Sequence, residues 1–154
     1  MKVGLAVAMV VDDEEAILAE LRRAGERHAA DHDVLHMSHT LAALHRGNLE
    51  RLAPFAGGEP DEHGDGLLDR AREAASRLAS RREETGLLLL RDLRALHLLY
   101  AEASIDYVLL GQGAQAARDA ALLDACSRNH AQTLRGLRWT VTRLKAAAPQ
   151  VLSG

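Results

Sequence analysis

The residues of this chain best suited to chemistry are its eight histidines, four of which fall between positions 28 and 39. Spacings of three, four and seven residues place side chains on one face of a helix, so His28, His32 and His39 share a face and His36 lies at its edge. Imidazole is a common ligand of zinc, copper, nickel and iron, and two histidines four residues apart can chelate one ion. This cluster predicts a metal site or a proton-handling site inside the protein.

Two further histidines lie on the apolar faces of two later predicted helices, at similar distances from a glycine turn at 111–113. If those helices are antiparallel, His97 and His130 lie at nearly the same height in a bundle. The complete set of predicted metal ligands is His28, His32, His36, His39, His97 and His130. We expect His45 and His63 at the surface. The alternative interpretation is that the core histidines only form hydrogen bonds within the protein.

The elements that would position these histidines are long helices. An acidic cluster at 12–15 suits a helix N-terminus, and nothing stops that helix before Pro54. A loop rich in glycine and proline follows at 54–66. The sequence predicts helices at about 12–53, 67–82, 87–110 and 116–147, with Pro149 ending the last.

These elements predict an all-α, antiparallel up-and-down bundle of four helices. If the Thr85-Gly86 pair does not interrupt the chain, three very long helices take their place. The predicted domain spans 12–149. An apolar N-terminal segment at 1–11 is predicted to be a poorly ordered or strand-like tail, and 150–154 is predicted to be a C-terminal tail.

Composition narrows the function classes. The chain has 154 residues, 47% of them hydrophobic and only 3% aromatic, which favours helices over a β-sandwich. A net charge of −3 argues against nucleic acid as a partner, and no uncharged apolar stretch reaches the ~18 residues of a membrane span. The single cysteine, Cys126, excludes an intrachain disulfide and fits the cytoplasm. We expect it to be a small, buried, apolar residue.

Apolar residues outside the expected core stripes predict a homodimer. Trp139 falls opposite the core stripe of the last helix, where an exposed indole favours a contact between subunits. A second apolar side of the first helix is formed by Val34, Leu41, Leu44 and Leu52.

The segment from Leu90 to Leu144 resembles the ferritin-like superfamily of helical bundles, in the style of bacterial ferritin-like stress and metal-binding proteins. The residues that carry the resemblance are Ala117-Arg118-Asp119, Asn129-His130-Ala131-Gln132-Thr133 and Arg143-Leu144. It implies a four-helix fold. The Glu-x-x-His motif of the di-iron members is absent, since Arg94 precedes His97 by three residues and Ser127 precedes His130. This departure argues against a di-iron centre. Asp31 and Asp33 lie off the predicted histidine face, which favours zinc, copper or nickel over di-iron, or no metal.

The sequence therefore predicts a cytoplasmic, ferritin-like helical-bundle protein that binds a metal ion or a small ligand through a histidine-lined core. The alternative is a non-catalytic, homo-oligomeric interaction or structural module. Neither a phosphate-binding glycine motif nor a hydrolase nucleophile motif occurs in the sequence, which favours a binding protein over an enzyme. A third hypothesis is a metal-dependent oxidase or hydrolase that uses the same histidines.

Overall fold

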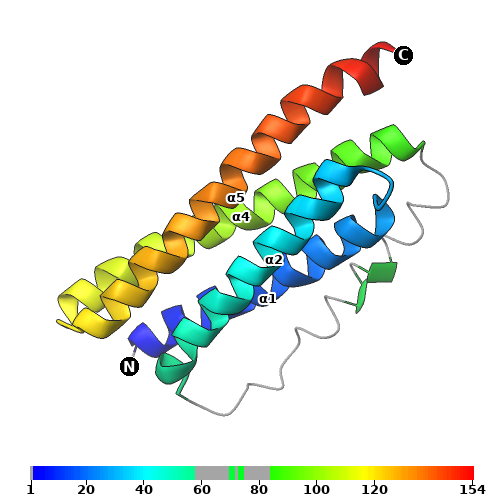
Figure 1. Cartoon of the computed structure of the whole chain (residues 1–154). Helices are drawn as coiled ribbons and strands as arrows, with labels where there is room; N and C mark the ends of the chain where they lie inside the picture. Colours follow the sequence, from blue (N-terminus) through cyan, green and yellow to red (C-terminus); the bar gives the residue numbers. More distant parts are fainter. Residues whose placement is uncertain (1, 58–69, 72, 75–83) are drawn as a thin grey trace.

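The computed structural model describes residues 2–57, 70–71, 73–74 and 84–154. Within these residues the main elements are four helices, namely α1 (Lys2–Arg27), α2 (His32–Leu52), α4 (Thr85–Ala116) and α5 (Ala120–Ser153), and a short 3-10 helix follows α2 at Ala53–Phe55. The four helices pack together as a bundle, which confirms the predicted all-α class (Figure 1). None of the helices described here has the length and apolar character needed to cross a membrane.

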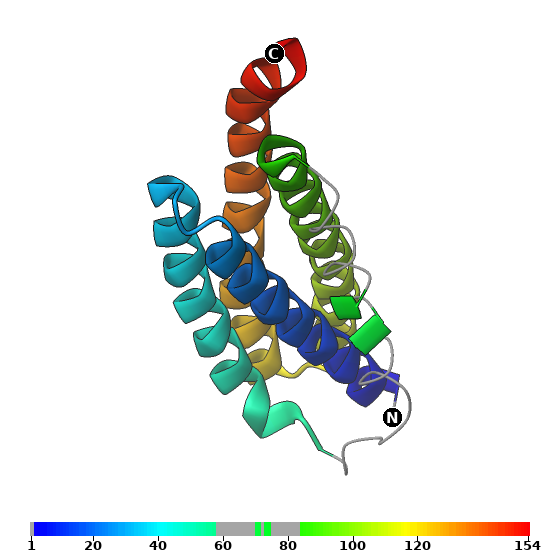
Figure 2. The same cartoon turned by 90° about the vertical axis from the view of Figure 1, so that its right-hand side faces the viewer.

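The bundle consists of two antiparallel helix pairs laid side by side. α1 packs against α2 and α4, while α5 packs against α4 and α2, and every neighbour runs antiparallel (Figures 1 and 2). Consequently α2 and α4 point the same way across the diagonal of the bundle. The up-and-down order holds within each pair, whereas α4 begins at the opposite end of the bundle from the end of α2 (Figure 1).

The N-terminal segment is not a tail. Residues 2–11 form the first turns of α1, and Val7 and Val10 are only 2% and 0% exposed. The reason is spacing: Val7, Val10, Glu14 and Ile17 follow one another at three- or four-residue intervals and so line one stripe of a helix. The predicted boundary at position 12 is therefore wrong, and the domain includes the residues before it.

The single helix predicted over 12–53 is in fact two. α1 ends at Arg27, and the chain turns between His28 and Asp31, whose backbone N–H donates to the His28 carbonyl (2.9 Å). The Asp31 carboxylate then caps α2 by accepting a hydrogen bond from the Val34 N–H (3.2 Å). No glycine or proline marks this turn, and Ala29 and Ala30 favour helix, so the sequence hides the break. Compared with one continuous helix, the turn changes the direction in which every later side chain points from the axis of α2.

The C-terminal pair also has different boundaries. α4 continues through the glycines at 111 and 113 to Ala116, and the turn to α5 places Arg118 in the left-handed region with φ of 56°. Asp119 caps α5 by accepting from the Leu122 N–H (3.0 Å). α5 then passes Pro149 and ends at Ser153, so the last five residues are not a separate tail. The helix predicted over 67–82 lies outside the described residues, except for 70–71 and 73–74, which are helical.

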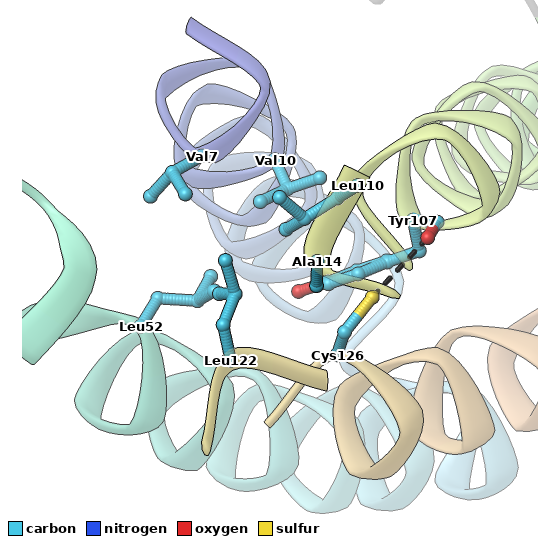
Figure 3. Close-up of a cluster of buried hydrophobic side chains, with 8 residues drawn as sticks. All are labelled: Val7, Val10, Leu52, Tyr107, Leu110, Ala114, Leu122 and Cys126. Atoms are coloured by element: carbon cyan, nitrogen blue, oxygen red, sulfur yellow. Dashed lines mark hydrogen bonds between the residues drawn. The ribbon is translucent and has the colours of Figure 1, made fainter. Parts of the chain in front are cut away.

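Two apolar clusters fill the interior. One lies at the end of the bundle that holds the chain's N-terminus and is drawn in Figure 3; it contains Val7, Val10, Leu52, Tyr107, Leu110, Ala114, Leu122 and Cys126. The second is built from Ile17, Leu21, Leu41, Leu96, Tyr100 and Ala103. Cys126 is 3% exposed, as predicted, and its thiol donates to the Tyr107 carbonyl (3.2 Å) (Figure 3). Burial raises the pKa of this thiol to about 11, which keeps it protonated.

Candidate functional site

A layer of polar side chains separates the two apolar clusters. All four helices contribute to it, and each side chain is at most 1% exposed. Its members are Glu14 from α1, His45 and Asn48 from α2, Tyr100 and Tyr107 from α4, and Asn129 from α5. Charged and polar groups so deeply buried are uncommon unless they pair with one another, so this layer is the first candidate for a functional site.

The Glu14 carboxylate is the centre of this polar layer. It lies 2.5 Å from Nδ1 of His45, and it accepts hydrogen bonds from the Asn48 amide (2.9 Å) and the Tyr107 hydroxyl (2.5 Å). The remaining nitrogen of His45, Nε2, lies 2.7 Å from the Tyr100 hydroxyl. We assign the Nδ1–H as the donor to Glu14, which leaves Nε2 to accept from Tyr100. Three donors on one carboxylate compensate for the water that Glu14 loses on burial.

The two phenols act as hydrogen-bond donors. Burial and then the nearby Glu14 charge raise the pKa of both Tyr100 and Tyr107 above their ordinary value of 10.0. Asn129 donates to the Tyr107 oxygen (3.2 Å) and to the Asn48 carbonyl (3.0 Å). The layer is thus a connected set of hydrogen bonds from α1 to α5.

A cation closes this layer on the side where α2 meets α5. The Arg51 guanidinium donates to the side-chain oxygens of Asn48 (3.0 Å) and Asn129 (3.1 Å). Both amides are thereby fixed in the orientation that turns their NH₂ groups toward the interior. The Asn48 side chain therefore bridges the Arg51 guanidinium and the Glu14 carboxylate.

Gly136 on α5 makes room for one end of the layer. A Cβ atom at this position would lie 2.1 to 2.6 Å from ring atoms of Tyr100. The phenol ring therefore rests directly on the α5 backbone, which only a glycine allows. This close approach holds the Tyr100 hydroxyl against His45.

Chemically, the layer can share protons along the Tyr100–His45–Glu14–Tyr107 chain, since each link is a hydrogen bond. In the part of the chain that the structure describes, these side chains are at most 1% exposed. The arrangement favours one register of the four helices, since buried polar groups that miss their partners are costly.

The predicted histidine face of the first helix does not form. His28 is buried at the α1–α2 turn, where its Nε2 lies 2.7 Å from Asp92, a carboxylate that also accepts two bonds from Arg27 (2.9 and 3.0 Å). His32, His36 and His39 lie on α2 and are exposed. The turn separates His28 from the other three, because it interrupts the helical phase on which the shared face depended.

His97 and His130 face different partners at different heights. His97 Nδ1 lies 2.8 Å from the Thr140 hydroxyl, whereas His130 Nε2 lies 2.8 Å from the Ser104 hydroxyl. The expected common height is wrong because α4 extends to Ala116, which moves the turn and shifts the register of α4 against α5. Burial lowers the pKa of His130, which stacks on the Tyr107 ring with centroids 6.1 Å apart.

The six predicted ligands are therefore not gathered around one point. In the part of the chain that the structure describes, no group of three or more His, Cys, Asp or Glu side chains is suitably placed for a metal ion. Metal binding stays a prediction, to be decided by metal analysis. His63 lies outside the described residues.

His45, which we expected at the surface, is fully buried. The apolar spacing of α2, counted from its true first residue, predicts this burial. Positions 34, 38, 41, 45, 48 and 52 alternate three- and four-residue steps, and all six are buried. The burial of Glu14 was missed for a similar reason. Glu14 was assigned to the first turn of a helix, whereas α1 begins at Lys2, twelve residues before Glu14.

A second acidic feature lies between α1 and α4. Burial raises the pKa of Asp13 to about 8, and the hydrogen bond and charge of Asp106 and the charge of Glu102 add to the effect. The second carboxyl oxygen of Asp13 is buried and has no hydrogen-bond partner within the described residues. Burial and the neighbouring carboxylates therefore favour the protonated form of Asp13.

The residues expected at a dimer interface lie inside the bundle instead. Val34, Leu41 and Leu52 are fully buried, while Leu44 and Trp139 are partly buried and pack against the second apolar cluster. For the four residues on α2 the cause is the unpredicted turn at His28–Asp31, whereas Trp139 lies on α5, which has no such break. Any self-association has to use another face.

Comparisons with family models, with curated proteins and with solved structures find no match for this chain. The site is therefore interpreted from its own geometry.

Proposed function

We propose that this protein is a non-catalytic helical-bundle module that self-associates through the outer face of α4 and α5. The observation that carries the proposal is a row of exposed aliphatic side chains on α4, in which Ile105 is 62% exposed and Leu98 50%. Solitary exposed aliphatic residues are ordinary, but a continuous row is typical of an interface.

The spacing of this row suits another helix. Leu98, Ala101, Ile105 and Val108 alternate steps of three and four residues, the pattern by which one helix packs its side chains between those of another. Ala101 is partly buried and Val108 is 47% exposed, so the row is open to solvent along its length.

The row continues onto α5. The contacts between Ser104 and His130 and between His97 and Thr140 set the register of the two helices. In this register Leu134 and Val141, which are 39% and 36% exposed, lie on the side of α5 that adjoins the row. We call the surface formed by Leu98, Ala101, Ile105, Val108, Leu134 and Val141 the α4–α5 face.

The interior supports a structural role over catalysis. Among the described residues, four histidines are buried or partly buried, and each lies within hydrogen-bond distance of a protein partner: Asp92 for His28, Glu14 and Tyr100 for His45, Thr140 for His97, and Ser104 for His130. Side chains already engaged with one another stabilise a fold, and they become ligands only by giving up those bonds.

Sedimentation velocity over a wide concentration range tests the proposal. The wild-type protein is expected to sediment as a dimer, and Ile105→Glu as a folded monomer, since a carboxylate in an apolar interface loses its water without a partner. Leu5→Glu is the matched control, because Leu5 is a similarly exposed leucine (68%) on α1. A wild-type monomer at all concentrations, or an Ile105→Glu dimer, contradicts the proposal.

A further inference from the structure

A groove of about 640 Å³ runs along the outer side of the α1–α2 pair. Because α1 and α2 form the opposite layer of the bundle from α4 and α5, the groove and the α4–α5 face lie on opposite sides (Figure 2). Its volume falls within the range of small-molecule pockets, about 300–1,000 Å³. Its walls are mostly apolar, with Leu18, Leu21 and Ala42 among the lining residues.

The floor of the groove contains an unpaired polar group. Ser38 is 2% exposed, lines the groove, and has no hydrogen-bond partner for its hydroxyl within the described residues. Gly25 lies opposite on α1, where a Cβ atom would be 3.1 Å from Ser38 Cβ and 3.4 Å from its Oγ. Gly25 thus allows α1 and α2 to approach closely at Ser38. The hydroxyl oxygen has almost no accessible surface, so Ser38 closes the floor of the groove and its hydroxyl lies out of a ligand's reach.

The charges around the groove are arranged along its length. The contacts of Glu14 with His45 and of Gly25 with Ser38 fix the antiparallel register of α1 and α2. In this register Arg46 lies near the Leu18 end of the groove, with Arg22 and His39 further along. The other end, beside the turn, is lined by Ala29, Leu35 and the single acid Glu26. One end is therefore basic and the other is mainly apolar.

We propose that this groove binds a soluble, single-chain carboxylate amphiphile. The apolar stretch takes the hydrocarbon chain, and the carboxylate lies at the basic end beside Arg46. Arg22 lies further along the groove, where its guanidinium is 3.8 Å from the Glu73 carboxylate. A guanidinium matches a carboxylate through two parallel hydrogen bonds, which explains why a carboxylate fits this end better than a neutral head group does.

Titration calorimetry with sodium decanoate, kept below its micelle concentration, tests this proposal on the full chain. We expect saturable binding, and affinity that rises about fourfold for each methylene added up to the length of the groove. Nonyltrimethylammonium, which has the same nine-carbon chain and the opposite charge, is expected to bind at least about tenfold more weakly. Equal binding of the two amphiphiles, or no saturable binding of decanoate, overturns the proposal.

Variants locate the site. Ala42→Phe fills the groove and is expected to abolish binding, whereas Ala43→Phe, its exposed neighbour on α2, leaves binding unchanged. Arg46→Glu keeps the fold, since Arg46 is exposed, and weakens binding about tenfold. Ser38→Ala is a control that leaves the affinity unchanged, because the hydroxyl oxygen has almost no surface accessible from the groove.

Two outcomes would overturn the assignment even if decanoate binds. Unchanged affinity in both Ala42→Phe and Arg46→Glu places the ligand elsewhere. Binding to vesicles of anionic phospholipid without binding to decanoate shows a membrane surface as the partner instead. Because the groove and the α4–α5 face are separate, Ile105→Glu should bind decanoate as wild type does, so the two proposals fail independently.

Discussion

The two buried tyrosines of α4 provide a test of how the interior is stabilised. Tyr107 donates its hydrogen bond to the Glu14 carboxylate, whereas Tyr100 lies against Nε2 of His45, which we assign as a neutral acceptor. Replacement of either residue by phenylalanine keeps the ring and removes only the hydroxyl. The pair therefore compares a bond to a charged acceptor with a bond to a neutral one in the same environment.

We expect Tyr107→Phe to lower the free energy of unfolding by about 2–3 kcal/mol, and Tyr100→Phe by about 1 kcal/mol. The difference has a physical cause. Without the Tyr107 hydroxyl, a buried carboxylate loses one of its three donors, while the loss of Tyr100 leaves a neutral imidazole nitrogen unpaired. Urea unfolding followed by far-UV circular dichroism measures both values, provided that the slopes agree among the variants.

A double-mutant cycle makes the test specific. On a Glu14→Gln background the acceptor of Tyr107 is no longer charged, so Tyr107→Phe should cost about 1 kcal/mol less than in the wild type. Equal losses for Tyr107→Phe and Tyr100→Phe, together with no coupling between Glu14 and Tyr107, would show that Glu14 is not the charged centre of the layer. That result would refute the reasoning.

Three further predictions concern other residues. Asp13→Asn should raise the thermal midpoint at pH 8 and leave it nearly unchanged at pH 4. The pKa of Asp13 in the folded state, about 8, exceeds the ordinary value of 3.8, so the stability of the wild type declines as the pH rises between these two values. A difference between variant and wild type that does not change with pH contradicts the raised pKa. Gly136→Ala should cost about 1–3 kcal/mol in thermal unfolding despite the better helix propensity of alanine, because the new methyl overlaps the Tyr100 ring; a stabilised variant would show that the ring moves freely. Exhaustive chelation should leave the thermal midpoint unchanged, because Glu14 and His45 bond to each other, and a lowered midpoint would reveal a structural metal.

The sequence was sufficient for the fold class but not for the helix boundaries. An alanine- and leucine-rich chain with few aromatic residues and three- and four-residue apolar spacing packs as helices. The turn at His28–Asp31 has no glycine or proline, and its only local sign is the capping carboxylate of Asp31. Conversely, Pro149 and the glycines at 111 and 113 lie inside helices, because tertiary packing outweighs the local preferences of single residues.

These boundary errors propagated directly to the site. Because the turn at His28–Asp31 was not predicted, the wrong side of α2 was expected to face the interior. His45 was therefore assigned to the surface, and His32, His36 and His39 to the core. Tyr100 and Tyr107 lie on the buried stripe of α4 that also contains Leu96, because no break interrupts the three- and four-residue spacing of that helix. Which polar side chains meet across helices depends on register, and a single helical pattern contains no information about register.

The arrangement of two antiparallel pairs has a consequence for folding. Each pair is a helical hairpin whose contacts are local in sequence, whereas the hydrogen bond from Tyr107 to Glu14 joins residues 93 positions apart. We expect the hairpins to form first and to dock last, since distant contacts carry the larger chain-closure entropy. Docking is also the step at which Glu14 exchanges water for its donors. If one hairpin docks a turn out of register, it buries that carboxylate without partners, so the polar layer discriminates against misdocked intermediates before the apolar clusters close around them.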